Sequence, residues 1–203
     1  MINHYLSAFG YLNHSIGLSN DHASVKDKDE FDEHLERAIK SLQKNFHLNV
    51  TGRLDSSTLD NMMTPRCGVT DNNMSPNYAL FDGKPKWNKN YLNYTFGSSV
   101  TPGVQEKLRP AVQKGFLEWF QWTEFTFEEA PQGHAAPPTI GKMHFDADEN
   151  WSIDNPNGDQ HDLVSVATHE IGHVLGLQHS TNADAIMYPF MNRTWNDKKK
   201  TER

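Results

Sequence analysis

The chain has 203 residues, 36% of them hydrophobic and 22% charged, which is enough to fold around one or two cores. A formal net charge of −7 argues against nucleic acid or an anionic membrane as the main partner. No apolar run is long enough for a transmembrane segment, and no signal peptide is visible at the start. The single cysteine allows no internal disulfide, which leaves the compartment open.

Residues 1–64 predict a small unit of three helices. A first short helix is expected around Tyr5–Phe9. The second has one apolar face, with acidic residues at its start and a turn at Thr51-Gly52 that ends it. Asp55 has the position of an N-cap for the third. The apolar face of the second helix consists of Phe31, Leu35, Ala38, Ile39, Leu42 and Phe46.

The only cysteine, Cys67, lies in the segment Pro65-Arg66-Cys67-Gly68-Val69-Thr70-Asp71. A lone cysteine is more often a small buried hydrophobic residue than a ligand. A thiolate is nevertheless a good zinc ligand, and Pro65 and Gly68 shape the backbone so that a loop can present the sulfur. If the chain holds zinc elsewhere, Cys67 could occupy a coordination position and exclude water.

The middle of the chain predicts a mixture of strands and a long helix. Residues 91–96 alternate as a strand does, and residues 125–127 are a second strand candidate. Between them, Thr101-Pro102 supplies an N-cap and a first-turn proline, and Pro110 should kink the helix that follows. Its apolar residues at helical spacing predict core packing: Val104, Leu108, Val112, Phe116, Trp119 and Phe120.

Residues 169–179 read H-E-x-x-H-x-x-G-x-x-H, the extended zinc-protease pattern. On a helix capped by Asp162, His169 and His173 lie on one face and can point at one ion. His179 would sit roughly 15 Å beyond His169 if the helix continued. Zn–N bonds are only about 2.0–2.1 Å long, so the chain must turn back, and Gly176 is where glycine permits that turn.

Three imidazoles leave a fourth zinc position open for water, as in catalytic sites. Glu170 follows the first ligand, so we expect it to take a proton from that water and pass it to the leaving amine. The alternative is an ordinary amphipathic helix with incidental histidines, or a site that exists but is inactive. The chain contains 11 histidines, but the five fixed residues of the pattern favour the zinc site.

Three motifs together resemble the matrixins, the matrix metalloproteinases, and most closely their plant-type members. These motifs are PRCGVTD, HEIGHVLGLQHS, and the later Ala185-Ile186-Met187-Tyr188-Pro189. The resemblance implies catalytic zinc bound by His169, His173 and His179, with Glu170 as general base. It also implies that Cys67 is a latency switch and that Met187 forms a turn beneath the metal.

The resemblance implies an α+β fold in two parts. Residues 1–77 would be a propeptide, a peptidoglycan-binding-like three-helix bundle with a linker. Residues 78–203 would be a truncated metzincin-like catalytic domain with a twisted mixed β-sheet, two long helices and zinc at the cleft. The expected protein is a monomeric, extracellular zinc endopeptidase zymogen that cleaves proteins or extended peptides.

The chain departs from the family pattern in two places. Most of a loop around residues 130–146 is absent, so His134 and His144 match only two of four structural-zinc ligands, while Asp146 and Glu149 match calcium ligands. The closing helix after Met187 has no counterpart in the polar end of the chain. Two other functions therefore stay open: an impaired remnant that binds zinc or a partner without proteolysis, and a helical module that binds a polymer.

Overall fold

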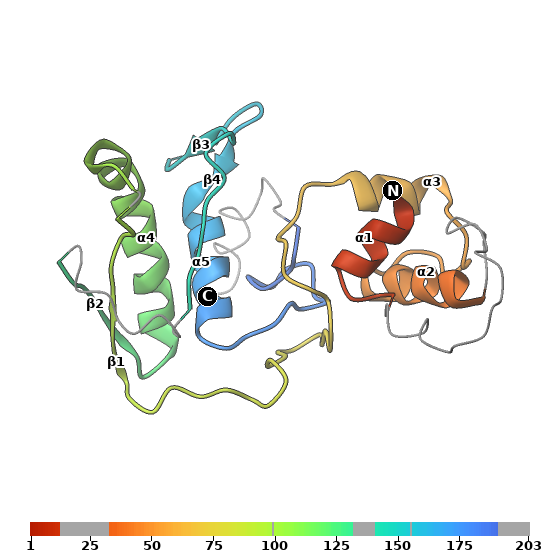
Figure 1. The fold of residues 1–203 in the computed structure, drawn as a ribbon, viewed down its shortest axis with the longest axis horizontal. Helices are drawn as coiled ribbons and strands as arrows, with labels where there is room; N and C mark the ends of the chain where they lie inside the picture. Colours follow the sequence, from red (N-terminus) through yellow and green to blue (C-terminus); the bar gives the residue numbers. More distant parts are fainter. Residues whose placement is uncertain (13–32, 99, 132–140, 155, 191–203) are drawn as a thin grey trace, which may run out of the picture. The chain divides into compact units, whose positions relative to one another are not determined.

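The computed structural model describes residues 1–12, 33–98, 100–131, 141–154 and 156–190. The chain forms two compact units. The N-terminal unit consists of Met1–Ala79 and Gln178–Ala183, and the second unit of Leu80–Leu177 and Asp184–Arg203. The predicted α+β class is confirmed (Figure 1). Among the described residues, no helix combines the length and apolarity that crossing a bilayer requires.

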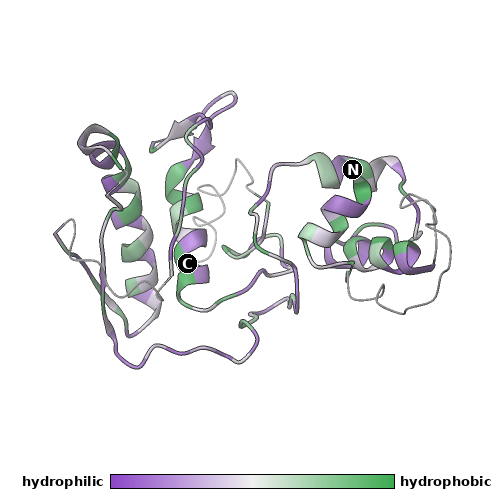
Figure 2. Cartoon of the chain, in the orientation of Figure 1, coloured by the Kyte–Doolittle hydropathy of each residue, from purple (hydrophilic) through white to green (hydrophobic). Residues whose placement is uncertain are grey.

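The N-terminal unit contains the three predicted helices, α1 (Ile2–Ala8), α2 (Glu33–Asn45) and α3 (Ser56–Met63). Figure 2 shows that α2 carries both apolar and hydrophilic residues, as an amphipathic helix does. Its apolar face is buried as predicted, although Phe31 lies outside the described residues. The core of the unit includes Leu6, Leu35, Ala38, Ile39, Leu42 and Phe46.

The second helix ends earlier than the sequence predicts. It stops at Asn45, before the expected turn at Thr51-Gly52, and His47 adopts a positive φ of 55° just beyond it. The segment that follows is held by the fully buried Gln43. Its Nε2 donates to Thr58 Oγ1 at 2.9 Å, and its Oε1 accepts from the Gly52 amide at 2.9 Å. A buried side-chain amide thus links α2 to the turn and to α3.

The second unit is built on two long helices, α4 (Pro102–Trp122) and α5 (Leu163–Val174), which lie side by side in Figure 1. Helix α4 continues on both sides of Pro110. The two helices approach closely at Gly115, where an added Cβ would lie 3.0 Å from Ile171 Cδ1. Trp119 Nε1 also donates to the carbonyl of Thr168 at 2.8 Å. These contacts hold α5 against α4.

The described strands form two small parallel sheets. Strand β1 (Tyr91–Tyr94) pairs with β2 (Thr126–Glu129), and β3 (Trp151–Ser152) pairs with β4 (His161–Asp162). Phe116 of α4 packs between Tyr94 and Phe127, with ring centroids 4.3 and 4.7 Å away. This aromatic contact joins the first sheet to the helix pair, and it continues into the core formed by Val112, Phe116 and Ile171.

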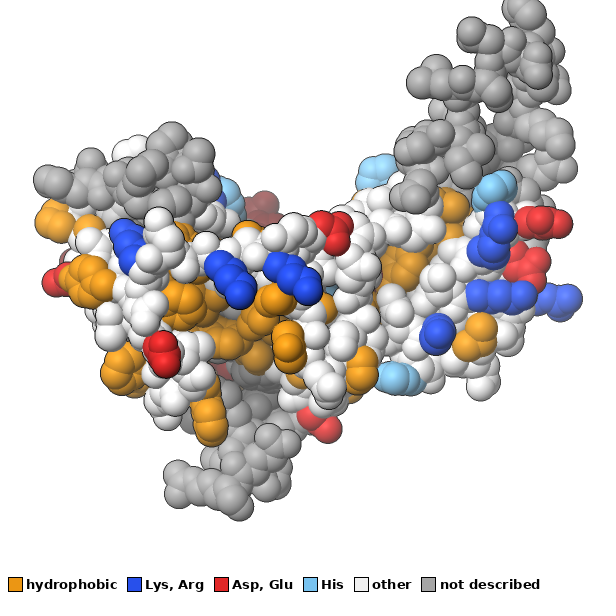
Figure 3. All heavy atoms as spheres, turned by 90° about the horizontal axis from the view of Figure 1, so that it is seen from below, with side chains coloured by type: hydrophobic (Ala, Val, Ile, Leu, Met, Phe, Trp, Pro, Cys, Tyr) orange, Lys and Arg blue, Asp and Glu red, His pale blue; other side chains and the backbone are white. Residues whose placement is uncertain are grey.

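The core prediction for α4 is wrong at two positions. Val104 and Phe120 are 47% and 49% exposed, because only the face of α4 toward α5 and the first sheet is covered. Figure 3 shows hydrophobic side chains at the surface beside lysine and arginine. Isolated exposed apolar residues are common on folded proteins and need no partner.

Asp55 caps α3 as predicted, and this cap makes the N-terminal unit sensitive to acid. Its carboxylate accepts from the amide and hydroxyl of Thr58 at 2.9 and 2.7 Å, and from Ser57 and Thr51. These hydrogen bonds, those from Thr58 first, hold the pKa of Asp55 well below its ordinary value of 3.8. Because the folded pKa is lowered, the stabilisation is present above pH 3.8 and is lost as the pH falls below it.

We therefore expect α3 amides to lose protection from hydrogen exchange as the pH falls below 3.8. In Asp55→Asn, which keeps an acceptor but cannot ionise, this loss should be shallower. The exposed Asp60 on the same helix provides a matched control, Asp60→Asn, that should follow the parent chain. An equally steep loss in Asp55→Asn would contradict the assignment of the acid sensitivity to this cap.

Candidate metal centre

Helix α5 sets the positions of His169 and His173. It begins directly after Asp162, whose carboxylate accepts from the Val164 amide at 3.0 Å and thereby caps the helix as predicted. The two histidines are four residues apart and lie on one face, and the helix is packed against α4. The helix packing therefore fixes the backbone positions of both histidines.

Backbone carbonyls fix the outer nitrogen of each ring. His169 Nδ1 lies 2.7 Å from the carbonyl oxygen of Ile186, and His173 Nδ1 lies 2.8 Å from that of Leu177. A carbonyl oxygen only accepts, so each Nδ1 must carry the proton and donate it. In a neutral imidazole the Nε2 atom then carries a lone pair and no proton.

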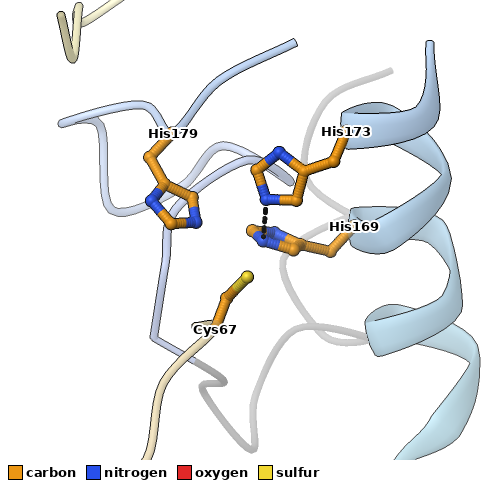
Figure 4. Close-up of side chains that lie close together, drawn as sticks. All are labelled: Cys67, His169, His173 and His179. Atoms are coloured by element: carbon orange, nitrogen blue, oxygen red, sulfur yellow. Dashed lines mark hydrogen bonds between the residues drawn. The ribbon is translucent and has the colours of Figure 1, made fainter. Parts of the chain in front are cut away.

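The two Nε2 atoms face one another 3.1 Å apart (Figure 4). Two neutral imidazoles in these tautomers cannot hydrogen-bond through Nε2, so a cation or an additional proton is needed to stabilise the pair. Two nitrogens bound tetrahedrally to one zinc would be about 3.3 Å apart, given Zn–N bonds of about 2.0–2.1 Å. Metal-ligating histidines commonly donate their other nitrogen to a carbonyl or carboxylate in this way. His169 and His173 thus fit a metal ion.

The segment around Met187 packs against α5. Met187 is buried, and a Cβ added at Gly172 would overlap its Sδ atom and lie 2.8 Å from the Trp119 ring. The preceding residue, Ile186, supplies the carbonyl that anchors His169. The methionine turn and the helix are therefore in direct contact at His169 and at Gly172.

The helix ends where the sequence predicts a turn. Helix α5 stops at Val174, and Gly176 has φ of +103°, in the left-handed region that glycine favours. After the turn, the chain pairs with a segment from earlier in the sequence. Leu177 forms an antiparallel bridge with Leu80, and the Phe81 amide donates to the Gly176 carbonyl at 3.2 Å. The turn lets the chain leave the helix axis before His179.

His179 belongs to the N-terminal unit and is fully buried. Its Nδ1 lies 2.9 Å from a carboxylate oxygen of Asp71, so this ring is anchored by a carboxylate as the other two are by carbonyls. Burial lowers the pKa of His179 below its ordinary value of 6.5, which favours the neutral ring. Cys67 of the same unit is buried, and its Sγ atom lies within 4.8 Å of a ring nitrogen of His179.

The other predicted site residues take different positions. Glu170 is half-buried on α5, directly after His169. His134 lies outside the described residues, and His144, Asp146 and Glu149 are exposed. In the part of the chain that the structure describes, none of the last three joins a group of three or more potential metal ligands. The Glu149 carboxylate instead lies 3.1 Å from His161 Nε2.

Two supporting residues were missed by the sequence analysis, Asp71 and Gly172. Asp71 stands inside the PRCGVTD segment, but no local pattern links it to a histidine 108 positions later. Gly172 occupies a variable position of the zinc motif, and only the packing of Met187 and Trp119 explains it.

Paired imidazoles beside a glutamate on one helix, in an α+β fold, are typical of metal-dependent peptidases. A family model described as Matrixin matches residues 131–202, and a peptidoglycan-binding domain model matches residues 1–62. Metalloendoproteinase 1 of Glycine max is 36% identical over 204 aligned residues, covering 79% of this chain and 67% of that protein. The chain therefore belongs to the matrixin family of zinc-dependent metalloendopeptidases.

Other relatives extend the comparison. Metalloendoproteinase 1-MMP of Arabidopsis thaliana is 35% identical, covering 91% of this chain and 60% of that protein. Stromelysin-1 of Rattus norvegicus is 32% identical, covering 88% of this chain and 42% of that protein. The chain thus spans 67% of the length of the Glycine max relative and 60% of that of the Arabidopsis relative. The Arabidopsis alignment runs over 228 positions, more than the 203 residues of this chain, so that relative has internal residues that this chain lacks.

We expect Gly172→Ala to destabilise the second unit, because the added methyl would overlap Met187 and crowd Trp119. Overpacking of this kind costs about 1–3 kcal/mol, and because two side chains must move we expect the upper part of this range, above the roughly 1 kcal/mol that alanine gains in helix propensity. Chemical unfolding followed by tryptophan fluorescence measures the change. Gly103→Ala in α4, where an added Cβ meets nothing within 4 Å, is the control. Equal stability of Gly172→Ala and its parent would contradict the packing argument.

Proposed function

We propose that the chain is the zymogen of a zinc endopeptidase. His169, His173 and His179 would hold the zinc, Glu170 would act as general base, and Cys67 would be the fourth ligand of the latent form. One observation carries the proposal: the Nε2 atoms of His169 and His173 face each other at 3.1 Å while both Nδ1 atoms are held by carbonyls. Membership of the matrixin family supports zinc as the ion.

The chain's own residues have separable roles in this proposal. When bound, zinc would polarise a substrate carbonyl and acidify a water molecule. The carbonyls of Ile186 and Leu177 hold protons at His169 Nδ1 and His173 Nδ1, which leaves the Nε2 lone pairs for binding. Glu170 follows His169 on the helix, and its carboxylate would accept a proton from the attacking water and return it to the leaving amide nitrogen.

Cys67 would control access to the site. It offers a sulfur ligand atom, and its loop is closed by a buried ion pair between Arg66 and Asp71. Sulfur bound in the fourth position would exclude water, and cleavage or release of the segment would admit it. We propose residues 1–77 as the propeptide and residues 78–203 as the catalytic part.

The substrates we propose are proteins or extended peptides, bound as an added strand with an apolar side chain beside His179. We further propose that the protein is extracellular and monomeric. Two further metal sites stay predictions. The first is calcium bound by Asp146 and Glu149, and the second is a residual zinc site at His134 and His144. Titration of the chain with calcium, followed by thermal stability, tests the first of them.

We expect Cys67→Ser to cleave a quenched peptide without pretreatment, because a hydroxyl is a much weaker zinc ligand than a thiolate. The parent chain should need a thiol-reactive reagent to do so, and a chelator should abolish both activities. Persistent latency of Cys67→Ser would count against the switch. Zinc binding without any hydrolysis by either protein would instead favour the non-proteolytic remnant.

Glu170→Ala should retain zinc but lose at least about 10²-fold in hydrolysis, the lower end of what general acid–base catalysis contributes. Zinc content is measured by elemental analysis and hydrolysis with the same quenched peptide, after treatment with the thiol reagent. Glu118→Ala, on α4, is a control that should keep the activity of the parent. Equal cleavage by Glu170→Ala and the parent would remove Glu170 from the mechanism.

A further inference from the structure

The loop that carries His179, residues 178–183, is held by the N-terminal part of the chain. The Gln178 amide donates to the Ala79 carbonyl at 2.8 Å, and the Thr181 amide donates to the Ser75 carbonyl at 3.1 Å. His47 Nε2 lies 3.0 Å from the Thr181 carbonyl. Residues on both sides of His179 are therefore tied to backbone that precedes residue 80, and His179 has a defined place in the N-terminal unit.

Asp71 is the side chain that meets the His179 ring itself. Its side chain is 1% exposed, and its Oδ1 lies 2.9 Å from His179 Nδ1. Its Oδ2 accepts from the Tyr11 hydroxyl at 2.7 Å and from Arg66 Nη1 at 2.8 Å. Its backbone amide donates to the Phe9 carbonyl at 3.0 Å. Hydrogen bonds from Tyr11 and Arg66 to the side chain, and one from the backbone amide to Phe9, thus fix a buried carboxylate against one imidazole.

The carboxylate is one half of a buried ion pair. Arg66 donates to both of its oxygens, from Nη1 to Oδ2 and from Nη2 to Oδ1. Arg66 is also buried, and its guanidinium carbon lies 3.9 Å from the centroid of the Phe9 ring. An ionised carboxylate accepts only, so it requires the proton on His179 Nδ1 and leaves Nε2 as the ligand atom.

We propose that Asp71 is a positioning residue for the metal, a proposal that rests on the zinc site proposed above. The segment Pro65–Asp71 would then contribute twice to the latent site: the sulfur of Cys67 binds the ion, and the carboxylate of Asp71 orients the third imidazole from behind. The intact chain would hold zinc more tightly because Asp71 selects the tautomer and the ring orientation of His179.

The expected effect on affinity is large enough to measure. Loss of a partner that orients a metal-binding histidine typically weakens metal affinity about 10–100-fold. Asp71→Ala removes the acceptor, so we expect zinc affinity of the full chain to fall by about that factor. Asp71→Asn keeps an acceptor oxygen of the same size but loses the charge, so its loss should be smaller than that of Asp71→Ala.

The experiment uses the full chain and two readouts other than activity. Competition with a chromophoric chelator gives the zinc affinity of the parent, Asp71→Ala, Asp71→Asn and the exposed control Asp60→Ala, which should match the parent. Long-range ¹H–¹⁵N spectra of the metal-free chain identify which nitrogen of His179 is protonated. We expect protonation on Nδ1 in the parent and a shift toward Nε2 in Asp71→Ala, which a purely structural role of Asp71 would not produce.

The outcomes separate this inference from the proposed function. A parent chain that binds no zinc would overturn the zinc site itself. A parent that binds zinc, with Asp71→Ala equally tight, would overturn only the role of Asp71. The tautomer of the parent tests the inference even if Asp71→Ala does not fold, because protonation of His179 on Nε2 contradicts it directly.

Discussion

Each of the three histidines is held by a hydrogen bond from its Nδ1 atom to an acceptor that cannot donate. For His169 and His173 the acceptors are backbone carbonyls of the segments that follow the helix, and for His179 the acceptor is a carboxylate. An imidazole on a solvent-exposed helix can rotate and change tautomer. Here both freedoms are removed before any ion arrives, so little conformational entropy remains to be lost on binding.

The helix pair beneath the site explains why this arrangement is rigid. Gly115 and Gly172 allow close approach at two points on either side of the helix interface, one to Ile171 and the other to Met187 and Trp119. Close-packed protein interiors have low compressibility and transmit small displacements. The spacing of His169 and His173 therefore depends on residues that carry no chemistry themselves, which is why Gly172 matters although it occupies a variable position in the motif.

The sequence predicted the features that depend on local chemistry. Asp55 and Asp162 cap helices, and Gly176 takes a positive φ, because each requirement is met within a few residues. The end of α2 was missed because the buried Gln43 binds the following segment, a tertiary effect that propensity does not encode. The contact of Asp71 with His179 was missed for the same reason. The motifs predict the ligand candidates, but the acceptors that hold their Nδ1 atoms come from segments that only the folded chain brings close.

The order of the elements has a consequence for how the second unit forms during synthesis. Strand β1, helix α4 and strand β2 follow one another without interruption, and β1 pairs with β2 directly. A parallel pair needs a crossover of this kind, and here the crossover helix also supplies Phe116, which packs on both strands. This strand–helix–strand segment can close its own contacts while α5 is still in the ribosome, since chains emerge from the N-terminus. The histidine helix would then dock onto a surface that already exists, and the segment with Ile186 and Met187, which fixes His169, would follow it.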